Sequence, residues 1–293
     1  SINTSRRFLS GSGSPSAAVV FGGEVTPSGP SDTRKATEEY DGSSWTTVNS
    51  MNSGAGTHGS SGGSQTDVIS FAGRRGATVD NADNYNGTTW SASPATLALA
   101  RSMTSGLGSG TAALCATGET QPGPYTNVSE EYNKSANVIT AAAWASGGAL
   151  TAGARRGLAS GKNSQTLTAG LVFGGGGNPY SGLGVKTEEY DGTSFTAGGD
   201  LNTYRYTLGG AGTQTAGLGF GGYIYPPAVS SNATEEYDGS SWTSVNNMSD
   251  ARQSMASFGT QTAAIAAAGY SKPTTTNLNT TLSYDGTNWT ALS

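Results

Sequence analysis

The sequence predicts an all-β protein, a six-bladed β-propeller with four short antiparallel strands in each blade. Two observations lead to this fold. A unit of roughly 48 residues recurs six times, and each copy reads as four β-prone segments separated by glycine-containing turns. Since a four-stranded unit of this size cannot bury both of its faces alone, stacking the copies around an axis is the expected arrangement.

Composition agrees with an ordered, glycine-rich fold. Charged residues make up 12% of the chain, about half the usual share of roughly 25%, and 45 residues are Gly. The five Trp and thirteen Tyr recur at regular intervals and supply the apolar surface that disordered chains lack. A net charge of −5 without a basic run, and the absence of a long apolar run, predict no nucleic-acid partner and no membrane insertion.

The clearest repeated phrase is Thr-Glu-Glu-Tyr-Asp-Gly-Ser-Ser-Trp-Thr at residues 37–46, which returns at 187–196 with Phe195 for Trp and again at 234–243. Weaker copies cover 85–90, 129–134 and 284–289. The aligned aromatic residues are Tyr40, Tyr85, Tyr132, Tyr190, Tyr237 and Tyr284, followed in four copies by Trp45, Trp90, Trp242 and Trp289. We expect these rings to fill the wide gap between neighbouring blades at the periphery.

A second phrase precedes each of these and runs from an arginine to a Gly-Gly pair, as in residues 205–222. Its relatives cover 6–23, 56–73, 101–118, 156–175 and 252–269. Together the two phrases predict one domain over 1–293, with blades at 5–47, 53–92, 98–145, 153–197, 203–245 and 250–292. Small residues dominate the first two strands, as a crowded interior near the axis requires.

The Asp-Gly dipeptide between the last two strands is a strong hairpin signal. A two-residue loop at Asp41-Gly42 would pair Tyr40 with Ser43 and Glu38 with Trp45, which places Glu38, Tyr40 and Trp45 on one face. The phase of the repeat also predicts that no blade mixes strands from both termini. Closure of the ring then depends on packing between the first and last blades.

An arginine and an acid recur in register with the repeat. The arginines are Arg6, Arg101, Arg156, Arg205 and Arg252, and the acids are Glu38, Glu130, Glu188 and Glu235. The arginines are consistent with a cationic ring that captures an anionic group, or with structural pairing of each Arg to a Glu. Five equivalent positions favour the structural interpretation. Carboxylates in successive blades are too far apart to share Ca²⁺, so we expect no metal site.

The order of Arg, apolar strand, Gly-Gly, Tyr and Trp resembles the kelch repeat over essentially the whole chain. The double glycines at 22–23, 174–175 and 221–222 carry the resemblance, whereas Ala72-Gly73, Thr117-Gly118 and Ala268-Gly269 depart from it. The resemblance implies a propeller and does not imply a particular function. The Gly-, Ser- and Thr-rich phrase also resembles repeats in structural proteins of marine bacteriophages.

Residues for catalysis are scarce. A copper-radical enzyme resembling galactose oxidase would need several His and Tyr ligands and a Cys beside a Tyr, but this chain has one His and one Cys. His58 lies in a Gly/Ser-rich stretch and is predicted to be an exposed turn residue, while Cys115 is predicted to be a small buried residue. No Gly-x-Ser-x-Gly elbow stands in a strand-to-helix setting. We therefore expect no enzymatic activity and no cofactor.

The loops between the second and third strands, the b–c loops, differ in every unit and should emerge on one face. They cover 24–35, 74–81, 119–128, 176–185, 223–232 and 271–279. Variable loops on a rigid scaffold are frequent binding sites. Their candidate ligand-binding residues are Tyr125, Tyr180, Tyr223, Tyr225 and Tyr270, which suit a sugar ring or a protein surface. The alternative is that these tyrosines only pack the loops.

The resulting functional hypothesis is a non-enzymatic binding or structural propeller in a virion or extracellular assembly. It would contact other assembly proteins or a surface glycan through its b–c loop face. Two alternatives remain: a secreted carbohydrate-active enzyme and a cytoplasmic kelch-type adaptor.

Overall fold

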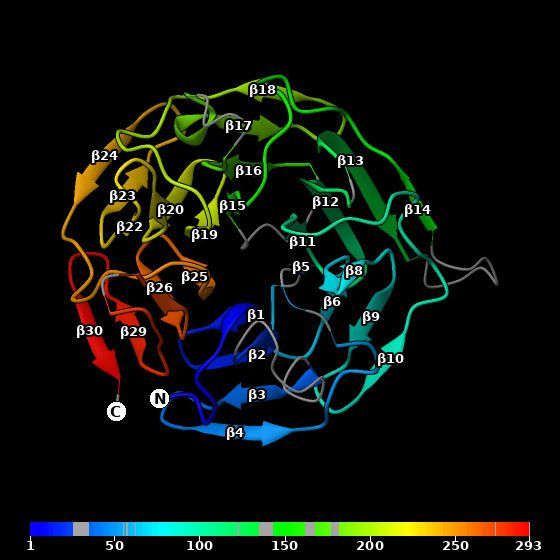
Figure 1. Ribbon diagram of the computed structural model, residues 1–293, viewed down its shortest axis with the longest axis horizontal. Helices are drawn as coiled ribbons and strands as arrows, with labels where there is room; N and C mark the ends of the chain where they lie inside the picture. Colours follow the sequence, from blue (N-terminus) through cyan, green and yellow to red (C-terminus); the bar gives the residue numbers. More distant parts are fainter. Residues whose placement is uncertain are drawn as a thin grey trace.

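The computed structural model describes residues 1–25, 35–54, 56, 58–61, 63–121, 123–134, 143–161, 168–176, 182–272 and 274–292. Six four-stranded antiparallel sheets surround a central axis, with the first strand of each blade innermost and the fourth at the rim (Figure 1). This arrangement confirms the predicted all-β, six-bladed β-propeller. In the described part of the chain, no helix is long and apolar enough to cross a membrane.

Each blade takes its four strands from one continuous segment of chain. Blade 1 is β1 (Arg7–Ser14), β2 (Ala17–Glu24), β3 (Thr37–Tyr40) and β4 (Trp45–Val48). Blade 2 is β5 (Gly59–Ser61), β6 (Val68–Phe71), β9 (Ala82–Tyr85) and β10 (Trp90–Ala92). Blade 3 is β11 (Ser105–Gly108), β12 (Ala112–Glu119), β13 (Tyr125–Asn133) and β14 (Ala143–Ser146).

The second half of the ring repeats the same order. Blade 4 is β15 (Ala159–Ser160), β16 (Gly170–Phe173), β17 (Thr187–Tyr190) and β18 (Phe195–Ala197). Blade 5 is β19 (Gly209–Thr213), β20 (Ala216–Phe220), β23 (Thr234–Tyr237) and β24 (Trp242–Val245). Blade 6 is β25 (Ala256–Thr260), β26 (Ala263–Ala267), β29 (Thr281–Tyr284) and β30 (Trp289–Leu292).

Several b–c loops contain small elements of their own. Blades 2, 5 and 6 carry two-stranded hairpins, and blade 4 carries a short 3-10 helix, η2 (Gly182–Val185). The hairpins are β7 (Arg74–Arg75) with β8 (Ala77–Thr78), β21 (Tyr223–Ile224) with β22 (Val229–Ser230), and β27 (Tyr270–Ser271) with β28 (Thr276–Asn277). These additional elements lie on one face of the propeller, and the four-stranded sheets of the blades remain alike.

The ring closes where blade 6 meets blade 1, next to both chain ends (Figure 1). Ile2 takes the place of the apolar linker residue found between other blades: its amide donates to the Asn279 carbonyl at 3.0 Å, as the Met248 amide does to Asn232 at 2.9 Å. One hydrophobic cluster joins Ile2, Leu9 and other residues of blade 1 to blade 6. No blade mixes strands from both termini, as the phase of the repeat predicts.

The Gly-Gly pair at the end of each second strand has two different backbone requirements. The first position has φ between 58° and 70°, the left-handed region that Ala72, Thr117 and Ala268 also adopt. The second position has φ between 89° and 128° and is Gly in all six blades. Only glycine reaches the second conformation readily, which explains why the repeat tolerates substitution at the first position alone.

The hairpin between the third and fourth strands differs from the predicted register. Tyr40 pairs with Trp45 and Glu38 with Thr47, so the loop has four residues, Asp41-Gly42-Ser43-Ser44, instead of two. The Asp41 carboxylate accepts the Ser43 and Ser44 amides, both at 2.8 Å, and only Gly42 takes positive φ. The predicted two-residue loop is therefore wrong, because the Asp side chain organises a longer turn.

Packing follows the predicted division between axis and rim. A methyl group on Gly106 would lie 2.3 Å from the Ser60 carbonyl oxygen of the neighbouring blade, so the inner strands have no room for larger residues. Towards the rim, aromatic rings fill the space between blades. Phe173 of blade 4, for example, lies 4.7 Å from Trp242 of blade 5, centroid to centroid.

The recurring arginines are buried and paired within their own blades. The four Arg–Glu pairs are Arg6–Glu38 at 2.6 Å, Arg101–Glu130 at 2.9 Å, Arg155–Glu188 at 2.9 Å and Arg205–Glu235 at 2.7 Å. These contacts support the structural interpretation. Each arginine also donates to a backbone carbonyl of its own blade, such as Arg6 to Gly22 at 2.7 Å and Arg101 to Val128 at 3.0 Å. The guanidinium thereby fixes the chain entering a blade to that blade's second and third strands.

Two details of the arginine series depart from the sequence prediction. Arg155, and not Arg156, occupies the repeat position in blade 4; Arg156 lies on the surface of the b–c face. In blade 6, Leu282 replaces the acid, and the buried Arg252 instead contacts Asp250 at 2.6 Å.

The second acid of each Glu-Glu pair joins neighbouring blades. The Tyr85 hydroxyl donates to Glu39 of blade 1 at 2.8 Å, and Tyr237 and Tyr284 contact Glu189 and Glu236 in the same way. Tyr190 also donates to Glu131. We call these contacts the Tyr–Glu clamps. Three tryptophans add a second bond across a blade interface, as Trp90 does to Thr37 at 3.0 Å.

Candidate binding site at the mouth of the central channel

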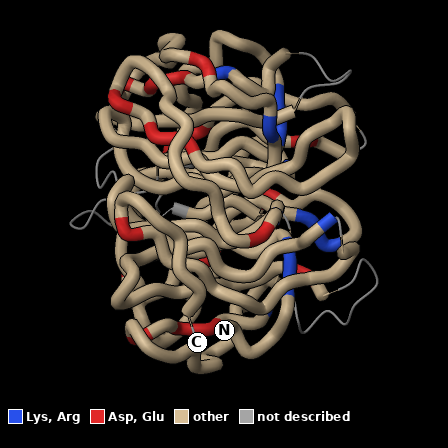
Figure 2. Tube along the Cα trace, turned by 90° about the vertical axis from the view of Figure 1, so that its left-hand side faces the viewer, with Lys and Arg blue, Asp and Glu red and all other residues tan. Residues whose placement is uncertain are grey.

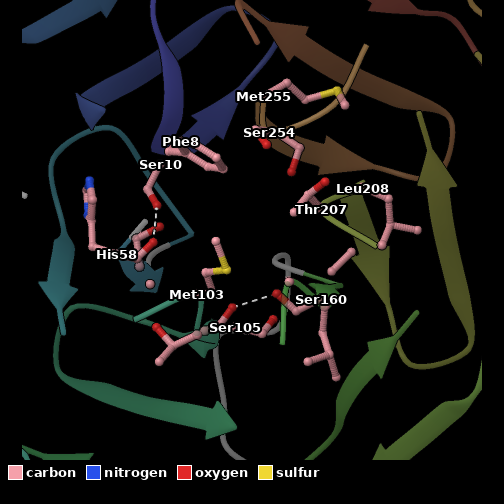
Figure 3. Close-up of a pocket in the computed structure, with 18 of the residues that line it drawn as sticks. Phe8, Ser10, His58, Met103, Ser105, Ser160, Thr207, Leu208, Ser254 and Met255 are labelled. Atoms are coloured by element: carbon pink, nitrogen blue, oxygen red, sulfur yellow. Dashed lines mark hydrogen bonds between the residues drawn. The ribbon is translucent and has the colours of Figure 1, made fainter. Parts of the chain in front are cut away.

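Five described residues, one from each blade except blade 2, surround the axis at or just before the first strand of their blade. These residues are Phe8, Met103, Gly157, Thr207 and Ser254, all with positive φ. They are joined by backbone bonds from blade to blade: Phe8 to Ser254 at 2.9 Å, Gly157 to Met103 at 3.1 Å, Thr207 to Gly157 at 2.6 Å and Ser254 to Thr207 at 2.9 Å. Figure 3 shows the side chains of Phe8, Met103, Thr207 and Ser254 around the axis. Because the bonds are between backbone groups, this collar is rigid.

On one side of the collar lies a cavity of about 100 Å³. Its lining is rich in hydroxyl groups, from Ser10, Ser60, Thr104, Ser160 and Ser257 (Figure 3). The Ser160 hydroxyl donates to the Gly106 carbonyl at 2.6 Å, so part of this polar lining holds blades together.

His58 borders this cavity and was expected on the surface. The structure corrects that prediction: His58 is 6% exposed, its Nδ1 lies 2.9 Å from the Ser70 hydroxyl, and its ring is 5.3 Å from Phe21. The Gly/Ser-rich stretch around it forms the inner strand of blade 2, which sequence composition alone did not reveal. His58 is packed against its own blade and against blade 1.

On the other side of the collar, the b–c face carries a ring of paired positions, which we call the mouth ring. In each blade, the residue after the repeat arginine position pairs with the residue directly after the Gly-Gly position. Blade by blade, the pairs are Arg7 and Glu24, Gly56 and Arg74, Ser102 and Glu119, Arg156 and Gly176, Tyr206 and Tyr223, and Gln253 and Tyr270. Each blade has a different pair of residues here, although the residues flanking the pairs repeat.

A cavity of about 330 Å³ opens within the mouth ring above the collar. Its polar and aromatic lining comes from four blades and consists of Arg7, Arg156, Tyr206, Tyr223, Gln253, Tyr270 and Lys272. Its volume lies at the lower end of the roughly 300–1,000 Å³ typical of ligand pockets. The collar forms the floor of this cavity, since Phe8, Met103, Thr207 and Ser254 line both cavities.

Two arginines of the mouth ring are held by aromatic rings and carboxylates. The Arg7 guanidinium lies 5.1 Å from the centroid of the Tyr270 ring, and its Nε donates to Glu24 at 3.3 Å. Arg156 lies 4.9 Å from the centroid of the Tyr125 ring and donates to Glu119 at 2.8 Å. Cation–π contact and the ion pairs fix the orientation of both guanidinium groups.

The structure brings three of the five candidate tyrosines to this site. Tyr223 and Tyr270 line the mouth cavity, and Tyr125 supports Arg156. Tyr225 lies further out in the blade 5 loop and is 41% exposed. Tyr180 lies outside the described residues. The tyrosines thus serve partly as packing partners and partly as cavity walls.

The sequence did not predict the cations of the site, which are Arg7, Arg74, Arg156 and Lys272. Arg156 was predicted only as a structural arginine of the repeat. A positional signal was available, since the residue after each repeat arginine and the residue after each Gly-Gly vary while their neighbours repeat. Only the strand pairing shows which of these variable positions face the axis.

Cys115 occupies a small, fully buried position in β12. Burial raises the pKa of its thiol, which keeps the sulfur protonated and weakly nucleophilic. Its environment agrees with a packing role.

Comparison with known proteins identifies the fold. No family model matches the chain, and no curated protein matches its sequence. Among solved structures, the chain is similar to YjhT, with a TM-score of 0.78 and 11% sequence identity over 100% of this chain and 99% of that one. At this identity the likeness concerns the fold alone. The chain forms a six-bladed β-propeller whose blades repeat in structure and diverge in the mouth ring.

Proposed function

We propose that the protein is a non-enzymatic binding propeller that holds a partner on its b–c face, centred on the mouth ring. The observation that carries this proposal is the contrast between repeated and divergent positions. The buried arginines, Gly-Gly pairs and Tyr–Glu clamps build the scaffold, whereas the mouth ring has a different pair of residues in every blade. Diverging side chains around a cavity with a rigid floor favour recognition of a specific partner.

The chemistry of the mouth ring favours binding over hydrolysis. Its two carboxylates, Glu24 and Glu119, are both engaged by arginines. Within the described ranges, no three His, Cys, Asp or Glu side chains gather in a way that would hold a metal ion. Mouth-ring arginine and tyrosine are also the residue types that contribute most to protein interfaces.

A protein of the same assembly is the favoured partner, and a surface glycan is the alternative. The resemblance to repeats of bacteriophage structural proteins supports a role in a virion or other extracellular assembly. The low charge content and closely packed blades suit a durable structural part.

Lysine-directed cross-linking of the intact assembly tests this proposal. Lys35, Lys186 and Lys272 lie on the b–c face, and Lys134 follows β13 on the opposite face. We expect cross-links to the partner at Lys272, with Lys35 or Lys186 as further sites, and none at Lys134. Cross-links confined to Lys134 would overturn the proposal. A glycan array hit without any protein cross-link would favour the glycan alternative.

A further inference from the structure

The charged side chains that are not buried in the scaffold differ in sign between the two faces of the propeller. On the b–c face, the described cations are Arg7, Lys35, Arg74, Arg75, Arg156, Lys186 and Lys272, against the acids Glu24, Asp80, Glu119, Asp200 and Asp250, the last of which pairs with the buried Arg252. Among the described residues, the opposite face has Lys134 against Asp41, Asp67, Asp191, Asp238 and Asp285. Figure 2 shows Lys and Arg gathered towards the right-hand face of the disc. A chain with net charge −5 therefore presents a positive face.

The positive face is strongest at its centre. Arg7, Arg156 and Lys272 line one cavity of about 330 Å³, with Arg7 and Lys272 contributed by blades 1 and 6 and Arg156 by blade 4. Lys272 is exposed and makes no ion pair among the described residues. Three cations thus face two carboxylates, and the cavity retains a positive excess. Field lines concentrate in a cleft with low-dielectric walls, which strengthens the attraction for an anion.

The mouth-ring arginines retain hydrogen-bonding capacity. Arg156 uses Nη1 for Glu119, and its Nε and Nη2 donate to no other described residue. Its guanidinium is already oriented by the Tyr125 ring, so accepting a second carboxylate costs little side-chain entropy. The ring faces of Tyr125 and Tyr270 that carry guanidinium groups are not available for stacking on a sugar. The site therefore favours an anionic group over a neutral saccharide.

A second copy of this chain does not supply that anion. The acids of its opposite face lie mainly in turns at the rim, away from the axis (Figure 1). Their carboxylates are also occupied: Asp41 Oδ1 accepts three hydrogen bonds and Oδ2 accepts one. The anion must come from a different molecule that reaches the axis.

We propose that the mouth binds an acidic peptide segment of the partner protein, with a carboxylate side chain inserted between Arg7 and Arg156. Lys272 attracts a second acid of the same segment. The rings of Tyr206 and Tyr223, whose centroids are 5.1 Å apart, provide an apolar wall for the methylene groups of the peptide's acidic side chains. This inference rests on the proposed function, because it names the chemistry of the partner at the same face.

Fluorescence anisotropy with two labelled peptides tests the inference. One peptide alternates Glu and Gly over eight residues, and its matched control alternates Gln and Gly. We expect the Glu peptide to bind, the Gln peptide to fail, and binding to weaken as salt rises. The double variant Arg7→Gln/Arg156→Gln should lower affinity by about tenfold or more. Lys134→Gln, on the opposite face, should leave it unchanged.

Several outcomes would overturn the inference: no binding of the Glu peptide at millimolar concentration, equal binding of both peptides, or equal losses of affinity from the double variant and Lys134→Gln.

A competition experiment distinguishes a peptide from a glycan. If an anionic oligosaccharide such as oligogalacturonate displaces the labelled peptide at a lower concentration than unlabelled Glu peptide does, the site belongs to a glycan. If cross-links to the partner at Lys272 persist while the Glu peptide fails to bind, the b–c face is the interface and the acidic ligand is wrong. Circular dichroism checks that each variant is folded.

Discussion

Arg155 and Arg156 are neighbours in the chain and have opposite roles. Arg155 is fully buried against Glu188, whereas Arg156 contacts Glu119 and Tyr125 at the mouth. Sequence spacing does not distinguish them, because blade 4 has three more residues between Arg155 and Gly174 than blade 1 has between Arg6 and Gly22. Only burial shows which arginine belongs to the scaffold.

This pair gives a matched test at the residue scale. Arg155→Ala should lower the free energy of unfolding by about 3–5 kcal/mol, because Glu188 is left as an uncompensated buried charge. Arg156→Ala should stay within about 1 kcal/mol of the parent protein, since its ion pair is partly exposed. Urea unfolding followed by circular dichroism measures both. Similar losses for the two variants would contradict the assignment.

At the scale of elements, the Tyr–Glu clamps connect third strands of neighbouring blades. Burial, together with the adjacent Glu, raises the pKa of Tyr85, Tyr190, Tyr237 and Tyr284 well above the ordinary value of 10.0. In the unfolded chain the same tyrosines ionise near pH 10. Above that pH the unfolded state holds fewer protons than the folded state, so folding stability falls as pH rises.

We therefore expect stability from the clamps to be complete below about pH 10 and to be lost as the pH rises towards the folded-state pKa. Urea unfolding at a series of alkaline pH values measures the slope. Tyr237→Phe should have a shallower slope than the parent protein, because one clamp no longer titrates. Equal slopes would show that Tyr237 ionises alike in both states. The part of the ionised-phenol absorbance that the parent protein shows and the Tyr237→Phe variant lacks should appear only when the protein unfolds.

At the scale of the molecule, the junction of blades 6 and 1 lacks contacts that other junctions have. Neither Trp45 Nε1 nor Thr281 Oγ1, the equivalents of Trp90 and Thr37, has a hydrogen-bond partner. Ser283 stands where a clamp would have Glu, opposite Tyr40 of blade 1. Packing around Ile2 and backbone bonds such as Gly269 to Arg6, at 3.0 Å, hold this junction.

Restoring the missing clamp should strengthen the ring. Ser283→Glu is expected to raise the free energy of unfolding by about 0.5–1.5 kcal/mol, because the Tyr40 hydroxyl would exchange its bond to the Gly42 carbonyl, at 2.9 Å, for a stronger bond to a carboxylate. Hydrogen exchange should slow in β29 and β3. In a Tyr40→Phe background the gain should disappear. A gain that persists without the hydroxyl would point to another cause.

The sequence alone determined the fold and most of the scaffold, because scaffold positions recur six times and periodicity makes them visible. The Gly-Gly backbone, the buried arginines and the aromatic residues between blades all belong to this class. Tertiary structure decided the four-residue turn, the burial of His58 and the identity of the blade 4 arginine, since each depends on local contacts that spacing does not encode. It also located the mouth ring. Side chains from four blades line this site, and the most distant of them are more than 200 residues apart in the sequence, so they meet only because the ring closes. Since these residues differ between blades, a search for repeated residues does not find them.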